Sequence, residues 1–416
     1  MKKQIVILGA GFGGLAVALN LIKRLRKLKL LDEYQVLLID KNDYHTYTPL
    51  LYEIATTSEA VAGFRELCTL ASFSLASIGK RRGFSFMRAQ IGRMDFDGGN
   101  IFTTDGRNIG YDFLVVALGG KTNYFGIEGL AENSVSLKTL SDALRIREKV
   151  STAMALHQPK DVRVVVVGAG STGVELAGDL QLWLFGKAGG AGRVFLLGES
   201  DKPLNNFPPK VVMASTQRLN DLHIELAMNC RLEKVDEAFL YFNGGEKMRF
   251  DVLVWAGGIG QLDVLLDSDA SKDVDGQVFV NEFLEILPKT ENDNFRLSVY
   301  GIGDGVVVSD KTGRPAPLVA PEAISQANTV CVNILNVILK KDEKIRHEVR
   351  EWPYIIPIGG KWATAKIGRF IFSGFLAWVF KGLVEYRYLL SVLGWFDGTR
   401  FWVRGLLVFL KSDRLG

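Results

Sequence analysis

The chain has 416 residues, enough for two or three domains with large buried cores. Its 50 Lys and Arg nearly balance its 46 Asp and Glu, and a net charge of only +4 argues against a nucleic-acid-binding protein. The three cysteines are widely spaced and form no CxxC pair, so the sequence predicts neither a metal site nor a redox dithiol.

The first predicted element is a buried strand at residues 4–8, which runs into the sequence GAGFGG. In this signature Gly9 allows a tight turn, Gly11 lets the backbone approach a pyrophosphate, and Gly14 lets the following helix pack close to the strand. The next predicted strand ends at Asp40, whose carboxylate can accept hydrogen bonds from a ribose diol. The segment therefore predicts a dinucleotide site.

A second copy of this arrangement begins with a predicted strand at residues 163–167. The sequence GAGSTG follows, with Gly168, Gly170 and Gly173 in the three glycine positions, and Glu199 comes after the next strand. A lone GxGxxG is weak evidence because glycine turns are common. Two complete units of strand, loop, helix, strand and acid together predict two bound dinucleotides.

Both copies are followed by turn-rich sequence and then by a buried strand that runs into glycines, at Tyr111–Gly120 and at Asp251–Gly258. This repeated order indicates an internal duplication. We expect a first domain of residues 1–120 and 285–350, interrupted by a second domain of residues 121–284.

The segment Gly301-Ile-Gly-Asp304 is a strand end with glycines and an acid, just before a helix expected at Pro321. The Asp304 carboxylate can hold the ribityl chain or the phosphate-linking end of a flavin, although a turn or a helix cap would also explain it. If the first domain holds FAD, a helix beginning near Ala320 would aim its positive end at the flavin pyrimidine edge, where reduction places negative charge.

The C-terminal segment, residues 351–416, is basic and aromatic. From Lys361 onward it has nine Lys and Arg against three Asp and Glu, with four of the seven tryptophans. Its longest apolar run, Phe370–Phe380, has eleven residues and stops at Lys381, which is too short to cross a bilayer. We expect amphipathic helices on a lipid bilayer surface, with cations reaching toward the water. A dimerisation module or an extra core layer is the alternative.

Several motifs, in this order, resemble those of type II NADH:quinone oxidoreductases. They are GAGFGG, Asp40–His45 (DKNDYH), Pro49–Glu53 (PLLYE), GAGSTGVELAG, Trp255–Gly258 (WAGG) and Gly301–Asp304 (GIGD). The likeness covers nearly the whole chain. It implies an α/β fold of two Rossmann-like dinucleotide-binding domains, the second inserted in the first, plus a C-terminal amphipathic helical segment that anchors the protein to a membrane.

The activity implied by the resemblance is transfer of two electrons from NADH through FAD to a membrane quinone, without proton pumping. The protein would be peripheral, at the cytoplasmic face of the cell membrane, and a homodimer is compatible with this reading. The resemblance assigns FAD to Gly9, Gly11, Gly14, Asp40, Gly301 and Asp304. It assigns NADH to Gly168, Gly170, Gly173 and Glu199.

Two further assignments come from the same resemblance. An acid at Glu199 repels a 2′-phosphate, so NADH should be preferred to NADPH. Glu175 matches a family glutamate near the flavin that takes part in proton or quinone chemistry; on its own it would read as an acid in the first turn of a helix.

The quinone side of the resemblance falls on Ala320, Pro321, Ser325 and Gln326. The family motif there is Ala-Gln-x-Ala-x-Gln, and this chain has Pro321 and Ser325 in the two glutamine positions. A sulfide:quinone reductase is a rival reading, but it needs two cysteines at the flavin and only Cys331 lies in a suitable region. A slow-turnover flavin- and NADH-binding redox sensor is the other alternative.

Overall fold

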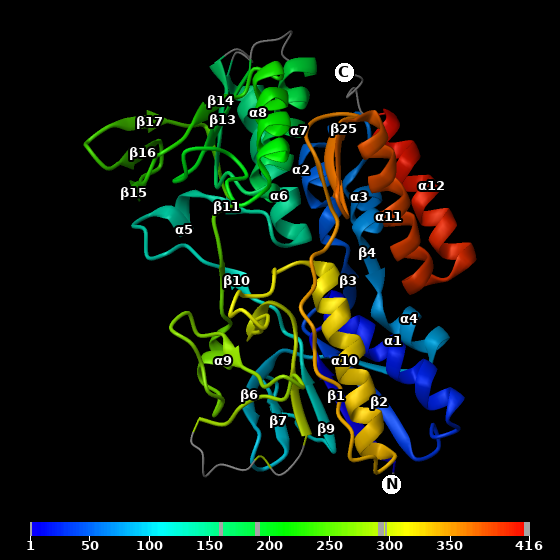
Figure 1. Ribbon diagram of the computed structural model, residues 1–416. Coiled ribbons are helices and arrows are strands. Elements are labelled where there is room, and N and C mark those ends of the chain that lie inside the picture. Colours follow the sequence, from blue (N-terminus) through cyan, green and yellow to red (C-terminus); the bar gives the residue numbers. More distant parts are fainter. Residues whose placement is uncertain (1, 158–160, 188–191, 290–294, 296–297, 412–416) are drawn as a thin grey trace. The chain divides into compact units, whose positions relative to one another are not determined.

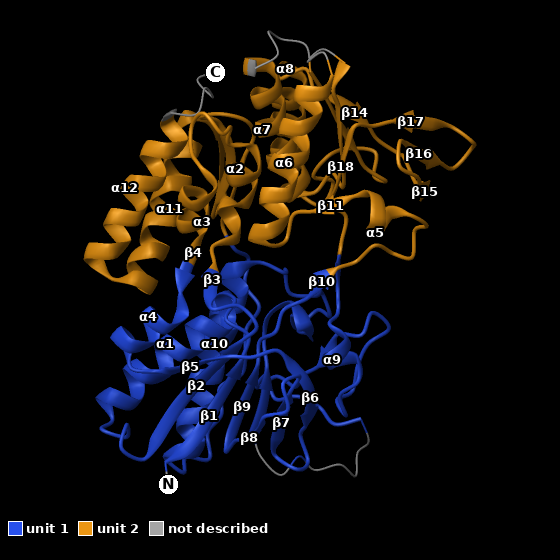
Figure 2. Ribbon diagram, turned by 180° about the vertical axis from the view of Figure 1, so that it is seen from behind, with its two compact units in different colours: residues 1–45, 73–121, 259–352 blue, residues 46–72, 122–258, 353–416 orange. Residues whose placement is uncertain are grey.

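The computed structural model describes residues 2–157, 161–187, 192–289, 295 and 298–411 (Figure 1). The chain divides into two compact units (Figure 2). Unit 1 contains residues 1–45, 73–121 and 259–352, and unit 2 contains residues 46–72, 122–258 and 353–416. Residues 259–284, grouped by the sequence with the second domain, cluster here with unit 1. The last five residues of the C-terminal segment lie outside the described part.

Unit 1 is built on a five-stranded parallel sheet in the order β21–β9–β1–β2–β5. Its strands are β1 (Lys3–Leu8), β2 (Tyr34–Asp40), β5 (Ser85–Arg88), β9 (Phe113–Val116) and β21 (Ser298–Gly301). The central strand β1 is covered on both faces, which explains why its sequence is a continuous apolar run rather than an alternating one.

Helices lie on one face of this sheet, where α1 packs against α10, and an antiparallel sheet lies on the other (Figure 1). The helices of unit 1 are α1 (Phe12–Lys27), α4 (Leu75–Arg82), α9 (Asp263–Leu266) and α10 (Ala320–Ile338), with the short turn η3 (Gly303–Gly305). The remaining strands are β6 (Ile91–Asp95), β7 (Asn100–Thr103), β8 (Asn108–Gly110), β20 (Val278–Phe279) and β22 (Val306–Val307).

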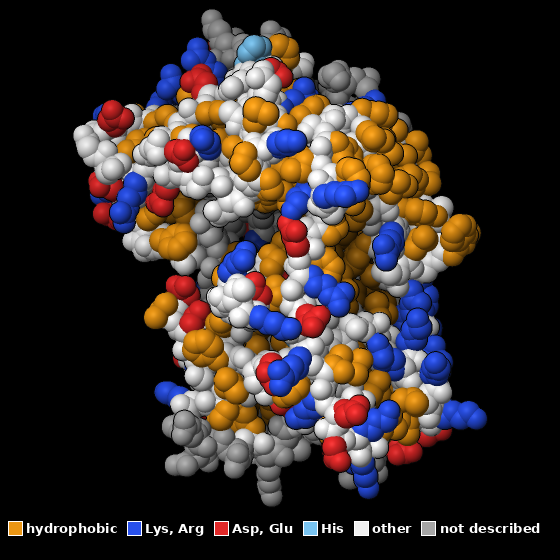
Figure 3. Space-filling view, viewed as in Figure 1, with side chains coloured by type: hydrophobic (Ala, Val, Ile, Leu, Met, Phe, Trp, Pro, Cys, Tyr) orange, Lys and Arg blue, Asp and Glu red, His pale blue; other side chains and the backbone are white. Residues whose placement is uncertain are grey.

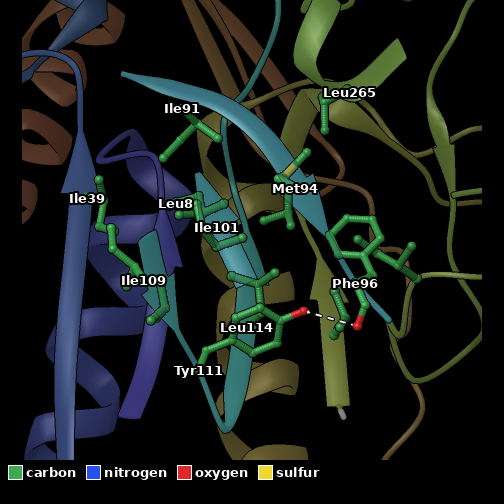
Figure 4. Close-up of a cluster of buried hydrophobic side chains, with 14 of the residues drawn as sticks. Leu8, Ile39, Ile91, Met94, Phe96, Ile101, Ile109, Tyr111, Leu114 and Leu265 are labelled. Atoms are coloured by element: carbon green, nitrogen blue, oxygen red, sulfur yellow. Dashed lines mark hydrogen bonds between the residues drawn. The ribbon is translucent and has the colours of Figure 1, made fainter. Parts of the chain in front are cut away.

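A hydrophobic core fills the space between the parallel sheet and the β6–β8 sheet (Figure 4). Leu8 and Leu114 face it from the parallel strands, and Met94 and Ile101 face it from the antiparallel ones. The Tyr111 hydroxyl donates a hydrogen bond to the Phe96 carbonyl at the edge of this cluster. The tight packing fixes the carboxyl ends of β1, β9 and β21, where the loops of interest begin.

Unit 2 repeats the plan with a parallel sheet in the order β11–β18–β12–β13–β14. Its strands are β11 (Val135–Ser136), β12 (Arg163–Val167), β13 (Arg193–Leu197), β14 (Glu225–Ala227) and β18 (Val252–Trp255). An antiparallel sheet packs on one face through a second core, and consists of β15 (Leu232–Val235), β16 (Phe239–Phe242) and β17 (Lys247–Arg249).

The helices of unit 2 come from three separate parts of the chain. They are η1 (Thr48–Leu50), α2 (Leu51–Thr56), α3 (Phe64–Ala71), α5 (Leu130–Asn133), α6 (Leu140–Leu156), α7 (Ser171–Lys187), α8 (Pro209–Asp221), α11 (Phe375–Leu393) and α12 (Trp395–Lys411). Before α11, the chain forms an antiparallel sheet of β23 (Tyr354–Pro357), β24 (Ala363–Ile367) and β25 (Phe370–Gly374). None of the described helices combines the length and apolar character needed to span a bilayer.

Four short strands mark places where the chain passes from one unit to the other. They are β3 (Tyr44–Thr46), β4 (Ser72–Ser74), β10 (Lys121–Thr122) and β19 (Ile259–Gly260). The C-terminal segment that the sequence predicted as amphipathic is thus a small sheet followed by two helices, and these pack with α3 and α7 inside unit 2.

Candidate dinucleotide sites and a buried charge cluster

The glycine loop of unit 1 joins β1 to α1, and its backbone leaves no room for side chains. Gly9 has φ +95°, and a Cβ there would lie 2.3 Å from the carbonyl oxygen of Ala117. A Cβ on Gly14 would lie 1.9 Å from the Gly9 oxygen. Gly11 begins the helix without a side-chain cap, and a Cβ there would meet nothing within 4 Å. The loop therefore offers helix N–H groups to an anion in open space.

Asp40 ends β2 beside this loop. Its Oδ2 accepts a hydrogen bond from the Ala10 N–H at 2.7 Å, and its Oδ1 accepts one from the Asn42 N–H at 2.8 Å. Burial raises the pKa of Asp40 above its ordinary value, and the two backbone hydrogen bonds offset part of that rise. The carboxylate is thus held against the glycine turn, and its contact with a ribose diol stays a prediction.

His45 supports the same loop, a role the sequence reasoning missed. Its ring is fully buried, and its Nδ1 lies 2.7 Å from the Ala10 carbonyl oxygen. Burial lowers the pKa of His45 to about 4, so the ring is neutral at physiological pH and donates from Nδ1. Phe12 contacts the ring edge-on, at 5.3 Å between centroids. The only sequence signal was the place of His45 in the DKNDYH segment after Asp40.

The turn that carries Asp304 is held by three glutamine side chains. The Gly303 N–H donates to Gln326 Oε1 at 2.7 Å. The Asp304 carbonyl accepts from Gln261 Nε2 at 3.2 Å and from Gln277 Nε2 at 3.0 Å. Gln261 and Gln277 come from loops with no recognisable motif, so sequence reasoning had no means of finding them. Their hydrogen bonds fix the backbone at Asp304, whose carboxylate is predicted to bind the flavin.

A small hollow lies between this turn and the N-terminus of α10. It is lined by Gly303 and Asp304 on one side and by Val319, Glu322 and Ala323 on the other. Val319 caps α10 without a side-chain hydrogen bond, and its carbonyl accepts hydrogen bonds from the N–H groups of Glu322 at 3.1 Å and of Ala323 at 3.2 Å. Gly301 lies at the base of the turn, where a Cβ would lie 2.7 Å from the Val306 side chain.

The four residues assigned to the quinone side all lie in the first two turns of α10. Pro321 is exposed, while Ala320 and Ser325 are partly exposed. Gln326 is buried, and its amide contacts Gly303 and Glu322. Gln326 thus supports the Asp304 turn, and a quinone contact at these residues stays a prediction.

The glycine loop of unit 2 has the geometry of the first loop. Gly168 has φ +117°, and a Cβ there would lie 2.6 Å from the backbone of Ala256. A Cβ on Gly173 would lie 1.8 Å from the Gly168 oxygen, and one on Gly170 would meet nothing within 4 Å. Glu199 follows β13 and is exposed. These residues suit a second pyrophosphate with an acid at the adjacent strand end.

A cluster of ionisable side chains is enclosed by α2, α7 and α11 of unit 2. Lys381 forms an ion pair with Glu53, and the exposed fractions of the two side chains are 15% and 9%. The Tyr52 hydroxyl donates to the Glu53 carboxylate at 2.7 Å, and the Lys381 ammonium lies 5.2 Å from the centre of the Tyr52 ring. The expectation that the cations of the C-terminal segment reach toward the water was wrong for Lys381, because its charge is neutralised inside the unit.

Glu175 belongs to the same cluster. It is partly exposed, but the surrounding side chains desolvate its carboxyl group and raise its pKa to about 8. Lys381 opposes this shift, while Asp179 and Glu53 add to it. Asp179 lies one turn further along α7 and accepts a hydrogen bond from the Gly360 N–H at 3.3 Å. A carboxyl group with this pKa can hold or release a proton near neutral pH.

The far side of the cluster contains another carboxyl group and two stacked tyrosines. Burial raises the pKa of Glu385 to about 7, with Lys381 opposing the rise. Tyr47 and Tyr388 stack at 5.1 Å between ring centroids. The cluster therefore contains four carboxyl groups around one ammonium, and two of them have pKa values close to neutrality.

The cysteines do not form the pair that a sulfide-oxidising site requires. All three are among the described residues, and each is a free thiol. Cys331 is fully buried, its Sγ contacts the Val17 carbonyl, and burial raises its pKa to about 12. Its thiol is therefore protonated and packed between α1 and α10, where it has core character.

The sequence profile described as pyridine nucleotide-disulphide oxidoreductase matches residues 3–327. This chain belongs to that family. The mixed α/β fold expected from the sequence is confirmed by this match and by solved structures.

Comparison with individual proteins shows that the chain is similar to type II NADH:quinone oxidoreductases. The type II NADH:quinone oxidoreductase of Haemophilus influenzae is 26% identical over 381 residues, covering 82% of each chain. The enzyme of the same name, Ndh, from Mycobacterium tuberculosis is also 26% identical and covers 94% of this chain and 85% of its own. The predicted resemblance to type II NADH:quinone oxidoreductases is confirmed.

Two solved structures share the fold over at least 95% of this chain. NDH2 from Plasmodium falciparum, solved in complex with NADH, matches with a TM-score of 0.83 at 19% identity, covering 100% of this chain and 99% of its own. The sulfide:quinone oxidoreductase of Aquifex aeolicus matches with a TM-score of 0.75 at 21% identity, covering 95% and 92%. At these identities the likeness establishes the fold.

Proposed function

We propose that this chain is an FAD-dependent oxidoreductase that transfers two electrons from NADH to a membrane quinone without pumping protons. The observation that carries the proposal is the pair of glycine loops, each opening a helix after a central parallel strand and each followed by an acid at the next strand end. The similarity to type II NADH:quinone oxidoreductases, over 82% and 94% of this chain, favours this reaction among those of the family.

In this proposal unit 1 binds FAD. When bound, FAD accepts a hydride from NADH and returns two electrons to a quinone. The residues that would hold it are Gly9, Gly11, Gly14, Asp40, Gly301 and Asp304. They fit because the α1 N-terminus lacks a side-chain cap and an acid in its first turn, and because Asp40 is fixed at the loop. His45 and the three glutamines keep this frame rigid.

Unit 2 binds NADH in the same proposal. Gly168, Gly170 and Gly173 would receive the pyrophosphate at the start of α7, as the open space at Gly170 permits. Glu199 would accept hydrogen bonds from the adenosine ribose, and its negative charge would repel a 2′-phosphate. Its exposed position after β13 supports this role.

Glu175 is the residue we assign to proton transfer, because its pKa of about 8 lets it exchange a proton at physiological pH. Quinone would approach the start of α10 at Ala320, Pro321, Ser325 and Gln326. Pro321 and Ser325 replace the amides of the family motif, so hydrogen bonds to the quinone would come from other groups than side-chain amides.

The decisive experiment is rapid mixing of the purified protein with NADH, followed by a membrane-soluble quinone. We expect the oxidised flavin spectrum to bleach with NADH and to return with quinone. A flavin spectrum that NADH leaves unchanged would exclude the proposed reaction. A turnover far below that of a respiratory enzyme would favour the redox-sensor alternative. Reduction of quinone by sulfide would favour the sulfide:quinone reductase alternative.

The surface of α11 and α12 in unit 2 supports attachment to a lipid bilayer. Apolar side chains gather there on the molecular surface (Figure 3). The most exposed of them on these helices are Phe375, Leu376, Leu383, Val384, Trp395, Phe396 and Leu407. Arg387 and Arg400 are exposed on the same helices, where they can reach lipid phosphates, while the exposed Arg404 pairs with Glu66 at 3.4 Å. The side of the membrane, the cytoplasmic face, stays a prediction.

Sedimentation with vesicles tests this attachment. We expect the protein to bind vesicles that contain anionic lipid, and Trp395→Ser with Phe396→Ser to reduce binding about tenfold or more, because two large side chains no longer enter the interface. Met213→Ser with Phe185→Ser, which changes exposed apolar residues of unit 2 outside these helices, is the matched control. Unchanged binding together with a loss of dimers on size-exclusion would favour the dimerisation alternative.

A further inference from the structure

Glu322 is a buried carboxylate in the first turn of α10, and its exposed fraction is only 2%. Three side chains donate hydrogen bonds to it. His347 Nε2 lies 2.6 Å from Oε1, Trp352 Nε1 lies 2.7 Å from Oε2, and Gln326 Nε2 lies 3.1 Å from Oε1. The His347 side chain is also only 2% exposed. Segment 340–352 is thereby connected to the start of the helix.

The chemistry of these partners fixes the direction of every hydrogen bond. The Trp352 indole can only donate, and an ionised carboxylate can only accept. Burial alone would raise the pKa of Glu322, but the hydrogen bonds from His347, Trp352 and Gln326 outweigh it and lower the pKa. Glu322 is therefore ionised, and Gln326 must turn its NH₂ group toward it.

The orientation of the Gln326 amide also determines which of its atoms faces the Gly303 N–H. When the NH₂ group of Gln326 faces Glu322, its Oε1 faces Gly303 and accepts a hydrogen bond from the Gly303 N–H at 2.7 Å. The reverse orientation would place an NH₂ group against an N–H group. The charge on Glu322 thus decides whether the amino side of the Gly303–Asp304 turn is satisfied.

The carbonyl side of the same turn is held independently. Gln261 and Gln277 each donate to the Asp304 carbonyl, and both lie in unit 1 outside α10. With Gln326 on one side and this pair on the other, the turn is fixed at both ends of the Gly303–Asp304 segment. The hollow at the start of α10 is lined by this turn and by Glu322.

We propose that Glu322 is a positioning residue that orients the Gln326 amide and thereby holds the Gly303–Asp304 turn in the form that binds FAD. This rests on the proposed function, since it takes Asp304 as an FAD-binding residue. His347 and Trp352 anchor the Glu322 carboxylate, so segment 340–352 contributes to cofactor binding although it contains no dinucleotide motif. Glu322 itself need not touch the cofactor.

The test is a swap of the two side chains, measured by the rate of FAD release from the purified protein and by the flavin midpoint potential. Glu322→Gln keeps the size but forces at least one donor against a donor, and we expect FAD to leave about 5- to 50-fold faster. Gln326→Glu places two carboxylates together and should have an equal or larger effect. The double variant Glu322→Gln with Gln326→Glu can restore every hydrogen bond, with His347 in its other tautomer, and should recover most of the retention.

Glu348→Gln is the matched control, because Glu348 is exposed on the same segment. We expect it to release FAD at the parent rate. If Glu322→Gln does not fold, as judged by thermal melting, Gln326→Leu takes its place and should also accelerate release.

Two results would overturn the proposal. One is parent-like FAD release and potential in the single variants, and the other is a double variant no better than the worse single one. A fall in melting temperature without a change in release or potential would count against it too, since that is what a merely structural residue would give. A parent protein purified without FAD would overturn the proposed function and this proposal with it.

Discussion

The ammonium of Lys381 on α11 neutralises the carboxylate of Glu53 on α2, although the two residues lie 328 positions apart in the chain. The pair connects the C-terminal segment to a short helix near the N-terminus within unit 2. Glu175 and Glu385 lie in the same cluster, where burial raises the pKa of both carboxyl groups and the Lys381 charge opposes that rise.

Removing the positive charge of Lys381 should lower the free energy of unfolding. Lys381→Met removes the positive charge beside the buried Glu53 carboxylate, and we expect a loss of roughly 3–5 kcal/mol in the free energy of unfolding, measured by urea titration. The double variant Lys381→Met with Glu53→Gln should recover most of it, because both charges are then absent. Arg387→Met, on the exposed side of α11, should change stability by less than about 1 kcal/mol. Equal losses for Lys381→Met and Arg387→Met would contradict the buried pair.

Glu175→Gln should change how stability depends on pH. The folded-state pKa of about 8 is above the ordinary value of 4.5, so Glu175 favours the folded state fully below pH 4.5 and loses that contribution as pH rises through about 8. The melting temperature of the Gln variant relative to the parent should therefore rise between pH 5 and pH 9, on the order of 2–4 °C. A constant difference across this range would show that the carboxyl group is not desolvated.

The same variant should affect turnover selectively. If Glu175 transfers protons, Glu175→Gln should slow quinone reduction about 10²-fold or more, while the bleaching of flavin by NADH stays close to the parent rate. Rapid mixing separates the two steps. Asp179→Asn, which changes the neighbouring acid on α7, is the comparison variant, and we expect a smaller effect on quinone reduction. Equal slowing of both steps would argue for a general disturbance of unit 2.

Glu199→Ser should weaken the preference for NADH. Without the carboxylate, the 2′-phosphate of NADPH is no longer repelled, and we expect the ratio of kcat/KM for NADH to that for NADPH to fall about tenfold. Steady-state kinetics with both nucleotides measures it. Glu225→Ser, which changes an exposed acid on the neighbouring strand β14, should leave the ratio unchanged. A ratio that Glu199→Ser does not alter would remove Glu199 from the NADH site.

His45 should make the glycine loop of unit 1 sensitive to acid. Its pKa is lowered from 6.5 to about 4, so its contribution to stability is present above pH 6.5 and is lost as pH falls through about 4. His45→Gln keeps a donor for the Ala10 carbonyl but cannot be protonated. We expect the parent to release FAD faster below pH 5 and the variant to release it at a rate that changes little with pH. Parallel pH profiles would contradict this role.

The sequence was sufficient for the parts of the site that depend on backbone chemistry. Gly9, Gly14, Gly168 and Gly173 were predictable because a tight turn and close helix packing admit only glycine, so the motif itself encodes the geometry. The buried strands before these loops were equally readable from their continuous apolar runs.

The parts built from side chains distant in sequence were not predictable. Glu322 accepts hydrogen bonds from His347 and Trp352, which lie 25 and 30 residues away in an irregular segment. No periodic sequence pattern encodes this spacing. Lys381 looked like a surface cation because it ends an apolar run, and only the packing of α11 on the rest of unit 2 reveals Glu53 as its partner. Local sequence reports the faces of a helix but not what covers them.

Unit 2 takes its helices from residues 46–72, 122–258 and 353–416. During synthesis, α2 therefore leaves the ribosome more than three hundred residues before α11. Until Lys381 emerges, the carboxylate of Glu53 has to stay hydrated, so α2 cannot settle into its final place. This half of the molecule can therefore close only after α11 has been made, and a nascent chain that stops before α11 would lack the ammonium group that neutralises Glu53.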